Sequence, residues 1–268
     1  MSQKKVVIIT GASSGIGMAC SREFAARGFS VVLAARSYGQ IEDLSIQLES
    51  EGLDAFAVKT DVTKEADCRN LIDAAIARYG RIDVFVNNAG ISMRATFDEV
   101  DLQVLKKLMD VNFWGTVYCT KYALPHLLES GGSLVGISSI AGYQGLPGRT
   151  GYSASKFAMQ GFLESIRTEN MEKGLHVLIA APGFTSSNIR KSALTSKGTE
   201  QGSSPRTEEK MMPAEKVAVY IYDAVMNRKR TLVLTFAGKL AVLIKKLSPG
   251  LLDRLVLKNF AKELGFPL

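Results

Sequence analysis

Val6-Val-Ile-Ile-Thr-Gly-Ala-Ser-Ser-Gly-Ile-Gly17 is the stretch that decides the fold of this chain. Its first four residues form an apolar run typical of a strand buried on both faces, and the amphipathic pattern Gly15–Arg27 predicts a helix directly after it. Glycines at 11, 15 and 17 allow a tight turn and a close approach of the backbone to a pyrophosphate at the helix N-terminus. Their order is GxxxGxG, not the GxGxxG of the common dinucleotide fingerprint. Strand, turn and helix together predict a nucleotide site.

Short apolar runs alternate with helical patterns through most of the 268 residues. Buried strands are predicted at Val6–Ile9, Val31–Ala34, Ala55–Val58, Ile82–Val86, Leu134–Ile137 and His176–Ala180, with a last strand at Thr231–Phe236. The helical patterns are Gly15–Arg27, Ile41–Glu51, Lys64–Tyr79, Asp101–Leu128, Ser153–Met171 and Ala214–Asn227. This alternation predicts one α/β domain over residues 1–238, with a doubly wound parallel sheet, helices on both faces and a ligand site beyond the carboxyl ends of the strands.

Composition and charge narrow the class of protein. The three cysteines have neither metal-ligand nor CxxC spacing, which favours a reducing, cytoplasmic compartment. His126 and His176 lack metal-ligand spacing as well, so we expect no metal site. No stretch approaches the roughly 20 apolar residues of a membrane span. The net charge of +7 arises in residues 228–262, where nine basic residues and one acid leave about −1 for the rest, so we expect no nucleic-acid partner.

Tyr152 and Lys156 lie four residues apart in Tyr152-Ser-Ala-Ser-Lys156, on one face of a helix. An ammonium beside a phenol favours the phenolate and lowers its pKa below the ordinary value of about 10. We therefore expect the pair to act as a general acid/base near neutral pH.

The second predicted strand ends in Ala34-Ala-Arg-Ser37, about twenty residues past the glycines. An acid at this place would bind the ribose 2′-hydroxyl of NAD and repel a phosphate, but Ala35 is neutral. Arg36 offers a bidentate guanidinium for a 2′-phosphate. The cofactor predicted here is NADP(H) rather than NAD(H).

The motifs TGASSGIG, Asp61-Val62, Asn87-Asn-Ala-Gly90, Ser139, Tyr152-Ser-Ala-Ser-Lys156 and Pro182-Gly183 resemble those of the short-chain dehydrogenase/reductase family, in the same order and spacing. The resemblance covers roughly residues 5–190. It implies a Rossmann-type fold, a nicotinamide cofactor that carries the redox step and a homo-oligomer, either a dimer or a tetramer.

The same resemblance implies roles for individual residues. Ser139 would hydrogen-bond the substrate carbonyl, Tyr152 would donate a proton to its oxygen, and Lys156 would lower the pKa of Tyr152 and bind the nicotinamide ribose. Ser138 is chemically identical, and Ser139 is chosen on the family's serine-to-tyrosine spacing. Asn112 would support a water relay to the lysine; without the family it would be a helix-interior asparagine bonded to backbone. The implied cofactor-binding residues are Gly11, Ser13, Ser14, Gly15, Ile16, Gly17, Arg36, Ser37, Asp61, Val62, Asn88, Ala89, Gly90, Tyr152, Lys156, Pro182, Gly183 and Thr185.

Two segments depart from the alternation. Residues 185–212 are rich in Ser, Thr, Gly, Lys and Glu, which predicts a substrate lid or else disorder. Residues 239–268 predict a basic, apolar helical C-terminal extension, in which Arg254, Lys258 and Lys262 form a stripe and the apolar residues lie largely on other faces. Such a segment can bind an anionic membrane surface peripherally, or pack on the body or on a partner subunit.

The leading interpretation is an NADPH-dependent reductase of a hydrophobic ketone such as 3-ketosphinganine or a steroid, because the tail resembles those of family members with such substrates. A 3-oxoacyl-[acyl-carrier-protein] reductase is the alternative, although Thr231–Phe236 departs from the terminal VDGG pattern common in those enzymes. A non-catalytic NADP-binding sensor is the third. The presence of Asn112, Ser139, Tyr152 and Lys156 together argues against it.

Overall fold

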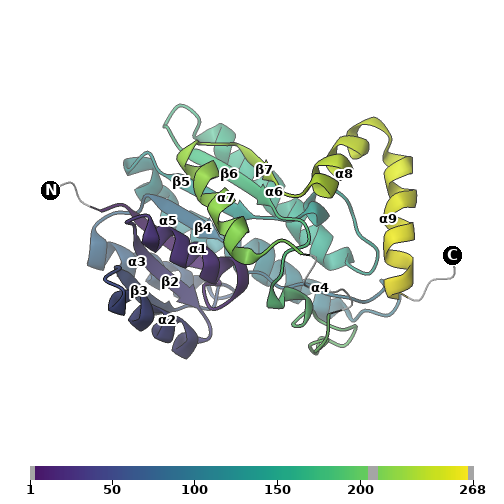
Figure 1. Ribbon diagram of the computed structural model, residues 1–268, viewed down its shortest axis with the longest axis horizontal. Coiled ribbons are helices and arrows are strands. Elements are labelled where there is room, and N and C mark those ends of the chain that lie inside the picture. Colours follow the sequence, from purple (N-terminus) through teal and green to yellow (C-terminus); the bar gives the residue numbers. More distant parts are fainter. Residues whose placement is uncertain (1–3, 205–210, 265–268) are drawn as a thin grey trace.

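A computed structural model describes residues 4–204 and 211–264 (Figure 1). Its central sheet contains seven parallel strands: β1 (Val6–Thr10), β2 (Ser30–Ala35), β3 (Ala55–Lys59), β4 (Val84–Asn87), β5 (Ser133–Ile137), β6 (His176–Ala181) and β7 (Thr231–Val233). They are ordered β3-β2-β1-β4-β5-β6-β7, so the chain winds outward from β1 in one direction and from β4 in the other. The predicted doubly wound fold is confirmed.

Helices cover both faces of the sheet. The described helices are α1 (Gly15–Ala26), α2 (Tyr38–Ser50), α3 (Glu65–Tyr79), α4 (Leu102–Met109), α5 (Gly115–Glu129), α6 (Thr150–Glu169), α7 (Ala214–Met226), α8 (Phe236–Leu247) and α9 (Pro249–Leu264). Alternate residues of β1 point to opposite faces: Val7 and Ile9 pack with α1, α2 and α7, whereas Val6 and Ile8 pack with α3, α5 and α6. Burial on both faces explains why these strands are apolar throughout.

The predicted helical pattern Asp101–Leu128 is helical along nearly its whole length but changes its winding once. Between α4 and α5 the residues Asp110–Trp114 form a π-helical turn, η1. Such turns insert an extra residue and are frequent at functional sites. This turn carries Asn112, so the irregularity falls at a predicted site residue.

The prediction of a strand over Thr231–Phe236 is wrong beyond Val233. At Thr235 the backbone adopts a positive φ of 68°, and its hydroxyl accepts a hydrogen bond from the N–H of Gly238 at 3.1 Å. That bond caps a new helix, so α8 begins at Phe236, three residues before the predicted extension. A Cβ on Gly238 would lie 2.8 Å from Ile140 Cδ1, so a larger residue here would require the isoleucine side chain to shift.

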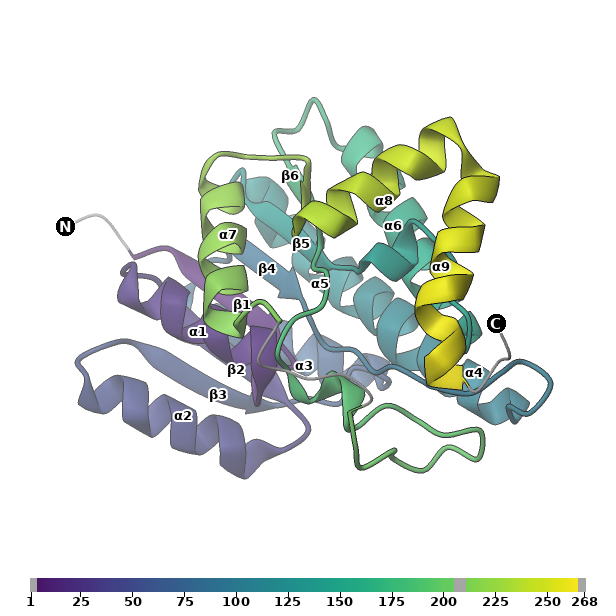
Figure 2. The same cartoon turned by 45° about the vertical axis from the view of Figure 1, so that its right-hand side comes forward.

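The second helix of the tail packs on the body of the protein. Leu252 and Phe260 of α9 are buried, Gln144 donates a hydrogen bond to Asp253 at 2.9 Å, and Arg149 forms an ion pair with Glu263. Figures 1 and 2 show α8 and α9 as two successive helices at the C-terminal end of the molecule. Of the fates left open for the tail, packing on the body is the one that α9 adopts. None of the helices in the described ranges is both long and apolar enough to span a bilayer.

Candidate active site

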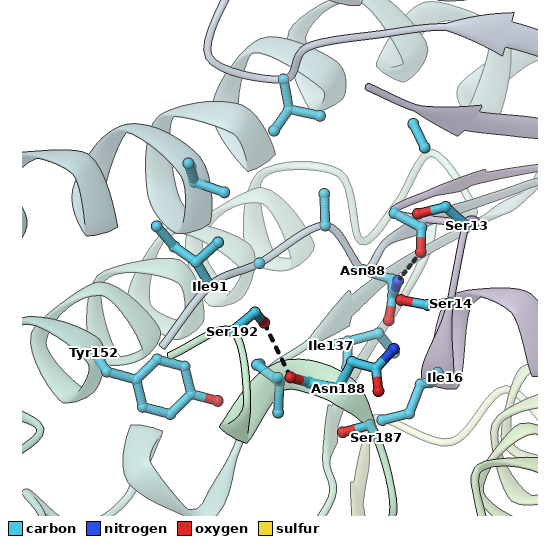
Figure 3. A pocket seen from close by; sticks show the side chains of 18 of the residues that line it. Ser13, Ser14, Ile16, Asn88, Ile91, Ile137, Tyr152, Ser187, Asn188 and Ser192 are labelled. Carbon is cyan, nitrogen blue, oxygen red and sulfur yellow. Dashed lines mark hydrogen bonds between the residues drawn. The ribbon is translucent and has the colours of Figure 1, made fainter. Parts of the chain in front are cut away.

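A cleft of about 400 Å³ lies at the carboxyl ends of the strands (Figure 3). It is lined by most of the predicted site residues: Gly11, Ser13, Ser14, Gly15, Ile16, Arg36, Ser37, Asp61, Val62, Asn88, Ala89, Gly90, Ser139, Tyr152, Lys156, Pro182, Gly183 and Thr185. Gly17 and Asn112 do not line it. The loops after β1 to β6 all contribute to this wall, as expected for the carboxyl edge of a parallel sheet.

The turn after β1 is built for close backbone packing. Gly11 and Gly15 adopt positive φ values of 66° and 54°, a conformation that favours glycine. Gly17 lies behind the turn, and a Cβ there would collide with the carbonyl oxygen of Gly11 and lie 2.5 Å from Asn88 Nδ2. Asn88 in turn donates from Nδ2 to the carbonyl oxygen of Thr10 at 2.8 Å. The glycines and Asn88 therefore hold a cradle whose shape fits a dinucleotide pyrophosphate.

The N-terminus of α1 faces this cradle. Ser14, its N-cap residue, makes no side-chain capping bond, so the first backbone N–H groups of the helix are not occupied by it. Amides at a helix N-terminus bind anions, and the helix dipole adds to their attraction. The turn thus has both the space and the donors that a phosphate group needs.

The end of β2 offers a positively charged rim. Arg36 is exposed and lines the cleft between Ala35 and Ser37. Ser37 is the N-cap residue of α2, its side chain makes no capping bond, and the first turn of α2 carries no acid. After the neighbouring strand β3, the carboxylate of Asp61 accepts hydrogen bonds from the backbone N–H and the hydroxyl of Thr63 at 3.1 and 2.8 Å.

Tyr152 and Lys156 lie in the first two turns of α6, and both reach the cleft. The Lys156 ammonium is buried, lies 5.8 Å from the centre of the Tyr152 ring and donates to the carbonyl oxygen of Ile137 at 2.8 Å. Burial lowers the pKa of Lys156 from 10.5 to about 8, because the apolar surroundings disfavour the charged amine.

The predicted lowering of the Tyr152 pKa by Lys156 is wrong for this structure. Burial of the phenol raises the Tyr152 pKa, and a hydrogen bond from Ser139 and the positive charge of Arg149 oppose that rise only in part. Desolvation dominates because the phenolate would lose its hydration. Tyr152 is therefore protonated at neutral pH, with its hydroxyl pointing into the cleft (Figure 3).

The two adjacent serines have different environments. Ser138 is buried, and its hydroxyl accepts a hydrogen bond from Gln160 Nε2 at 2.7 Å. Ser139 begins the short helix η2 (Ile140–Gly142), accepts from the N–H of Ala141 at 3.2 Å and hydrogen-bonds Tyr152. The structure thus brings Ser139, and not Ser138, together with the tyrosine.

Asn112 does not line the cleft but supports the residues that do. It is fully buried, accepts from the N–H of Ile91 at 2.8 Å, and donates to the carbonyl oxygen of Ile91 and to the hydroxyl of Ser155, each at 2.9 Å. A Cβ added to Gly90 would meet both Asn112 Oδ1 and Lys156 Nζ. Asn112 therefore connects the loop after β4 to α6 beside the lysine. Its side chain bonds the backbone of that loop, and not the backbone of its own helix.

The predicted lid lies on the cleft over its described part, and residues 205–210 fall outside the described ranges. Leu194 donates from its backbone N–H to the carbonyl oxygen of Ser92 at 2.8 Å and joins an apolar cluster against which Tyr152 packs. That cluster consists of Met93, Ala95, Val100, Val104, Leu108 and Leu194. The wall beside Tyr152 is therefore apolar.

Several lining residues had not been identified from the sequence. Lys107 and Val111 line the cleft from α4 and η1, and their spacing of four on a helical pattern is a signal that could have found them. The segment predicted as a lid contributes Asn188, Ile189, Arg190, Ser192, Leu194, Gly198 and Glu200. An irregular segment has no period, so no pattern could select these.

Comparison with known proteins identifies a family and several similar proteins. Residues 5–198 match the family model described as short chain dehydrogenase. The mouse protein "Dehydrogenase/reductase SDR family member 7B" is 36% identical over 264 residues, covering 96% of this chain and 82% of that protein. The Arabidopsis thaliana "11-beta-hydroxysteroid dehydrogenase 1A" is 40% identical over 187 residues, covering 69% of this chain and 53% of its own length. A Burkholderia phymatum short-chain dehydrogenase/reductase solved in complex with NAD has the same fold, with a TM-score of 0.81, 23% identity and coverage of 94% and 96% of the two chains.

Proposed function

This chain belongs to the short-chain dehydrogenase family of oxidoreductases with nicotinamide cofactors, and from that premise we propose that it is an NADPH-dependent reductase of a hydrophobic, lipid-like ketone. The observation that carries the proposal is the environment of Tyr152, a partly buried phenol hydrogen-bonded to Ser139 and packed against an apolar wall. A protonated phenol in such a place can give a proton to a substrate whose body is apolar.

Each polar group of the site then has a task. Ser139 orients the ketone oxygen through its hydroxyl, and Tyr152 transfers its phenolic proton to that oxygen as the carbonyl is reduced. A bound nicotinamide cofactor supplies the hydride. Lys156, with a pKa of about 8, remains mostly charged at neutral pH and stabilises the phenolate left on Tyr152. Because burial raises the pKa of Tyr152, the phenol is protonated in the resting enzyme and holds the proton that reduction requires.

The preference for NADPH rests on the end of β2. Arg36 and the hydroxyl of Ser37, which makes no capping bond to α2, offer donors for a 2′-phosphate. Ala35 has no carboxylate that would repel it. An Ala35→Asp variant should lose affinity for NADPH by about tenfold to a hundredfold while NADH binding is retained, because the added carboxylate repels the 2′-phosphate and competes for Arg36, whose charge-assisted contact is worth about 1.5–3 kcal/mol. Fluorescence titration of both cofactors measures the two affinities. A variant that still prefers NADPH as strongly as the wild type would contradict the assignment.

The substrate class rests on the apolar wall and on the relatives. Steroids and long-chain 3-keto amines such as 3-ketosphinganine are the leading candidates, and the steroid dehydrogenase named for Arabidopsis is consistent with the first. A 3-oxoacyl thioester is the second candidate, because the catalytic side chains would serve that reduction equally well. NADPH oxidation measured with a panel of all three compounds separates them, and a protein that binds NADPH but reduces none would be the sensor.

The role of Tyr152 has a direct test. Tyr152→Phe removes the proton donor and keeps the packing, so kcat/KM should fall by about 10²–10⁴-fold while NADPH still binds. Tyr220, exposed on α7, provides a matched control when it is changed to Phe. Reduction of ketones by the Tyr152→Phe protein at the wild-type rate would remove the mechanism.

We also propose that the protein is a homo-oligomer through α5 and α6. Trp114, the last residue of η1 before α5, and Phe157 of α6 are exposed, and the rings of Phe113, Tyr118 and Phe162 contact Trp114 or one another. Large exposed aromatic groups are enriched at protein interfaces. Light scattering of the Trp114→Asp protein should give a smaller mass than the wild type.

A further inference from the structure

One face of α8 exposes four large apolar side chains. Phe236, Leu240, Leu243 and Leu247 are 82%, 42%, 52% and 76% exposed. Their spacing of four, three and four residues matches the period of about 3.6 residues per turn, so they share one face of the helix. The opposite face packs on the body through Gly238 against Ile140. The stripe thus points away from the protein along the full length of α8.

Basic residues border this apolar stripe. Lys239 and Lys246 are exposed and seven residues apart, which puts both on the same edge of the stripe, and α8 contains no acid. The following helix continues this composition, with Leu251 and Leu255 about half exposed beside exposed Arg254 and Lys258. The acid Asp253 is engaged by Gln144.

We propose that α8 docks on an anionic lipid bilayer, with the stripe among the upper acyl chains and the lysines on the headgroups. An amphipathic helix with a basic border has the composition of helices that lie in the membrane interface. Charge complementarity favours lipid over another protein, because lysine is depleted at protein–protein interfaces but attracted to anionic lipid. Single scattered apolar residues would carry no such meaning, whereas an apolar stripe three turns long is a binding surface.

The stripe begins beside the cleft. Thr235, the residue before Phe236, lies against Gly183 of the cleft wall, where a Cβ would be 2.7 Å from the threonine hydroxyl. Ile140, on which α8 packs, follows Ser139. Docking would therefore bring the cleft next to the lipid surface. This step rests on the proposed function: a ketone dissolved in the bilayer would enter the cleft without crossing water.

Flotation of the full-length protein with vesicles tests the docking. Vesicles of phosphatidylcholine containing phosphatidylglycerol should carry the wild type upward, and vesicles of phosphatidylcholine alone should carry less. The double variant Leu243→Asn, Leu247→Asn should reduce the bound fraction at least tenfold. The double variant Lys239→Glu, Lys246→Glu should reduce it on anionic vesicles only, by at least about fivefold for each lysine. Ile46→Asn on α2, at a side chain 59% exposed, is the matched control and should float like the wild type.

Three outcomes overturn the proposal: a wild type that stays at the bottom of the gradient, equal loss of binding in the Ile46 control, or α8 variants that float normally. Light scattering of the same proteins tests the competing occupant, a second copy of the chain. If a second copy covers the stripe, the α8 variants should have a lower mass than the wild type, and the wild type should not float. Flotation needs no turnover, so its failure leaves the reductase proposal standing. Turnover of a water-soluble ketone without vesicles tests the reductase alone.

Discussion

Replacement of Lys156 by methionine should stabilise the protein while it inactivates the site. Burial lowers the pKa of Lys156 from 10.5 to about 8, and at about 1.4 kcal/mol per pH unit the buried charge costs the folded state about 3 kcal/mol. Methionine has a similar length and no charge, but it leaves the carbonyl oxygen of Ile137 without its donor, which costs about 1 kcal/mol. The unfolding free energy at pH 7 should therefore rise by about 2 kcal/mol.

The stability gain of the variant should depend on pH in a specific way. The pKa of this base is lower in the folded state, so the penalty is complete below pH 8 and disappears as the pH rises from about 8 to 10.5. The difference between the variant and the wild type should accordingly shrink by about 1.4 kcal/mol per pH unit above pH 8. Urea unfolding at a series of pH values from 7 to 9.5 measures it, with Lys121→Met, at an exposed lysine of α5, as the control that should change stability by less than about 0.5 kcal/mol.

Two results would refute this reasoning. A Lys156→Met protein that is less stable than the wild type at pH 7 would mean that the ammonium is paired and contributes to folding. A gain that stays constant from pH 7 to 9.5 would mean that packing, and not the charge, is responsible. NADPH oxidation by the same preparation should be lost in either case, so activity alone does not decide between them.

Three other variants test the architecture of the site. Gly17→Ala should lower NADPH affinity at least tenfold by fluorescence titration and stability by about 1–3 kcal/mol, because its Cβ has no space, whereas Gly39→Ala on α2, where nothing lies within 4 Å, should do neither. Ser139→Ala should slow ketone reduction about a hundredfold. Ser138→Ala should keep turnover but lower the unfolding free energy in urea by about 1 kcal/mol, because it removes a buried hydrogen bond. Equal effects of the two variants on the rate would contradict the assignment. Glu263→Gln should cost about 2–3 kcal/mol in the same assay, since it leaves the arginine opposite it without a counter-charge, and an unchanged midpoint would show the pair to be dispensable.

The core of the fold could be predicted because its signals are local. Runs of four to six apolar residues specify strands buried on both faces, and the glycines at 11 and 15 occupy backbone conformations that other residues rarely adopt. A parallel sheet then brings every strand's carboxyl end to one edge, so residues as distant as Arg36 and Pro182 line the same cleft. Each of these inferences needs only the chain within a few residues of the motif.

The features that escaped prediction depend on contacts between distant segments. Thr231–Phe236 reads as a strand by its β-branched residues, yet the cap at Thr235 and the close packing of Gly238 on Ile140 end it early. The lid is irregular, so its lining residues follow no period. The charge of Lys156 was expected to decide the pKa of Tyr152, but the degree of burial decides it, and burial is a property of the packed molecule.

The amino-acid sequence by itself determined the doubly wound sheet, the glycine-rich turn and the set of polar side chains around the cleft, because periodicity and backbone conformation are encoded residue by residue. Only the tertiary structure decided that Ser139 and not its neighbour meets Tyr152, that the phenol is protonated, and that α9 is anchored on the body while α8 presents an apolar stripe outward. Solvent exposure and electrostatic environment depend on which distant segments come together, and that is established only when the chain has folded.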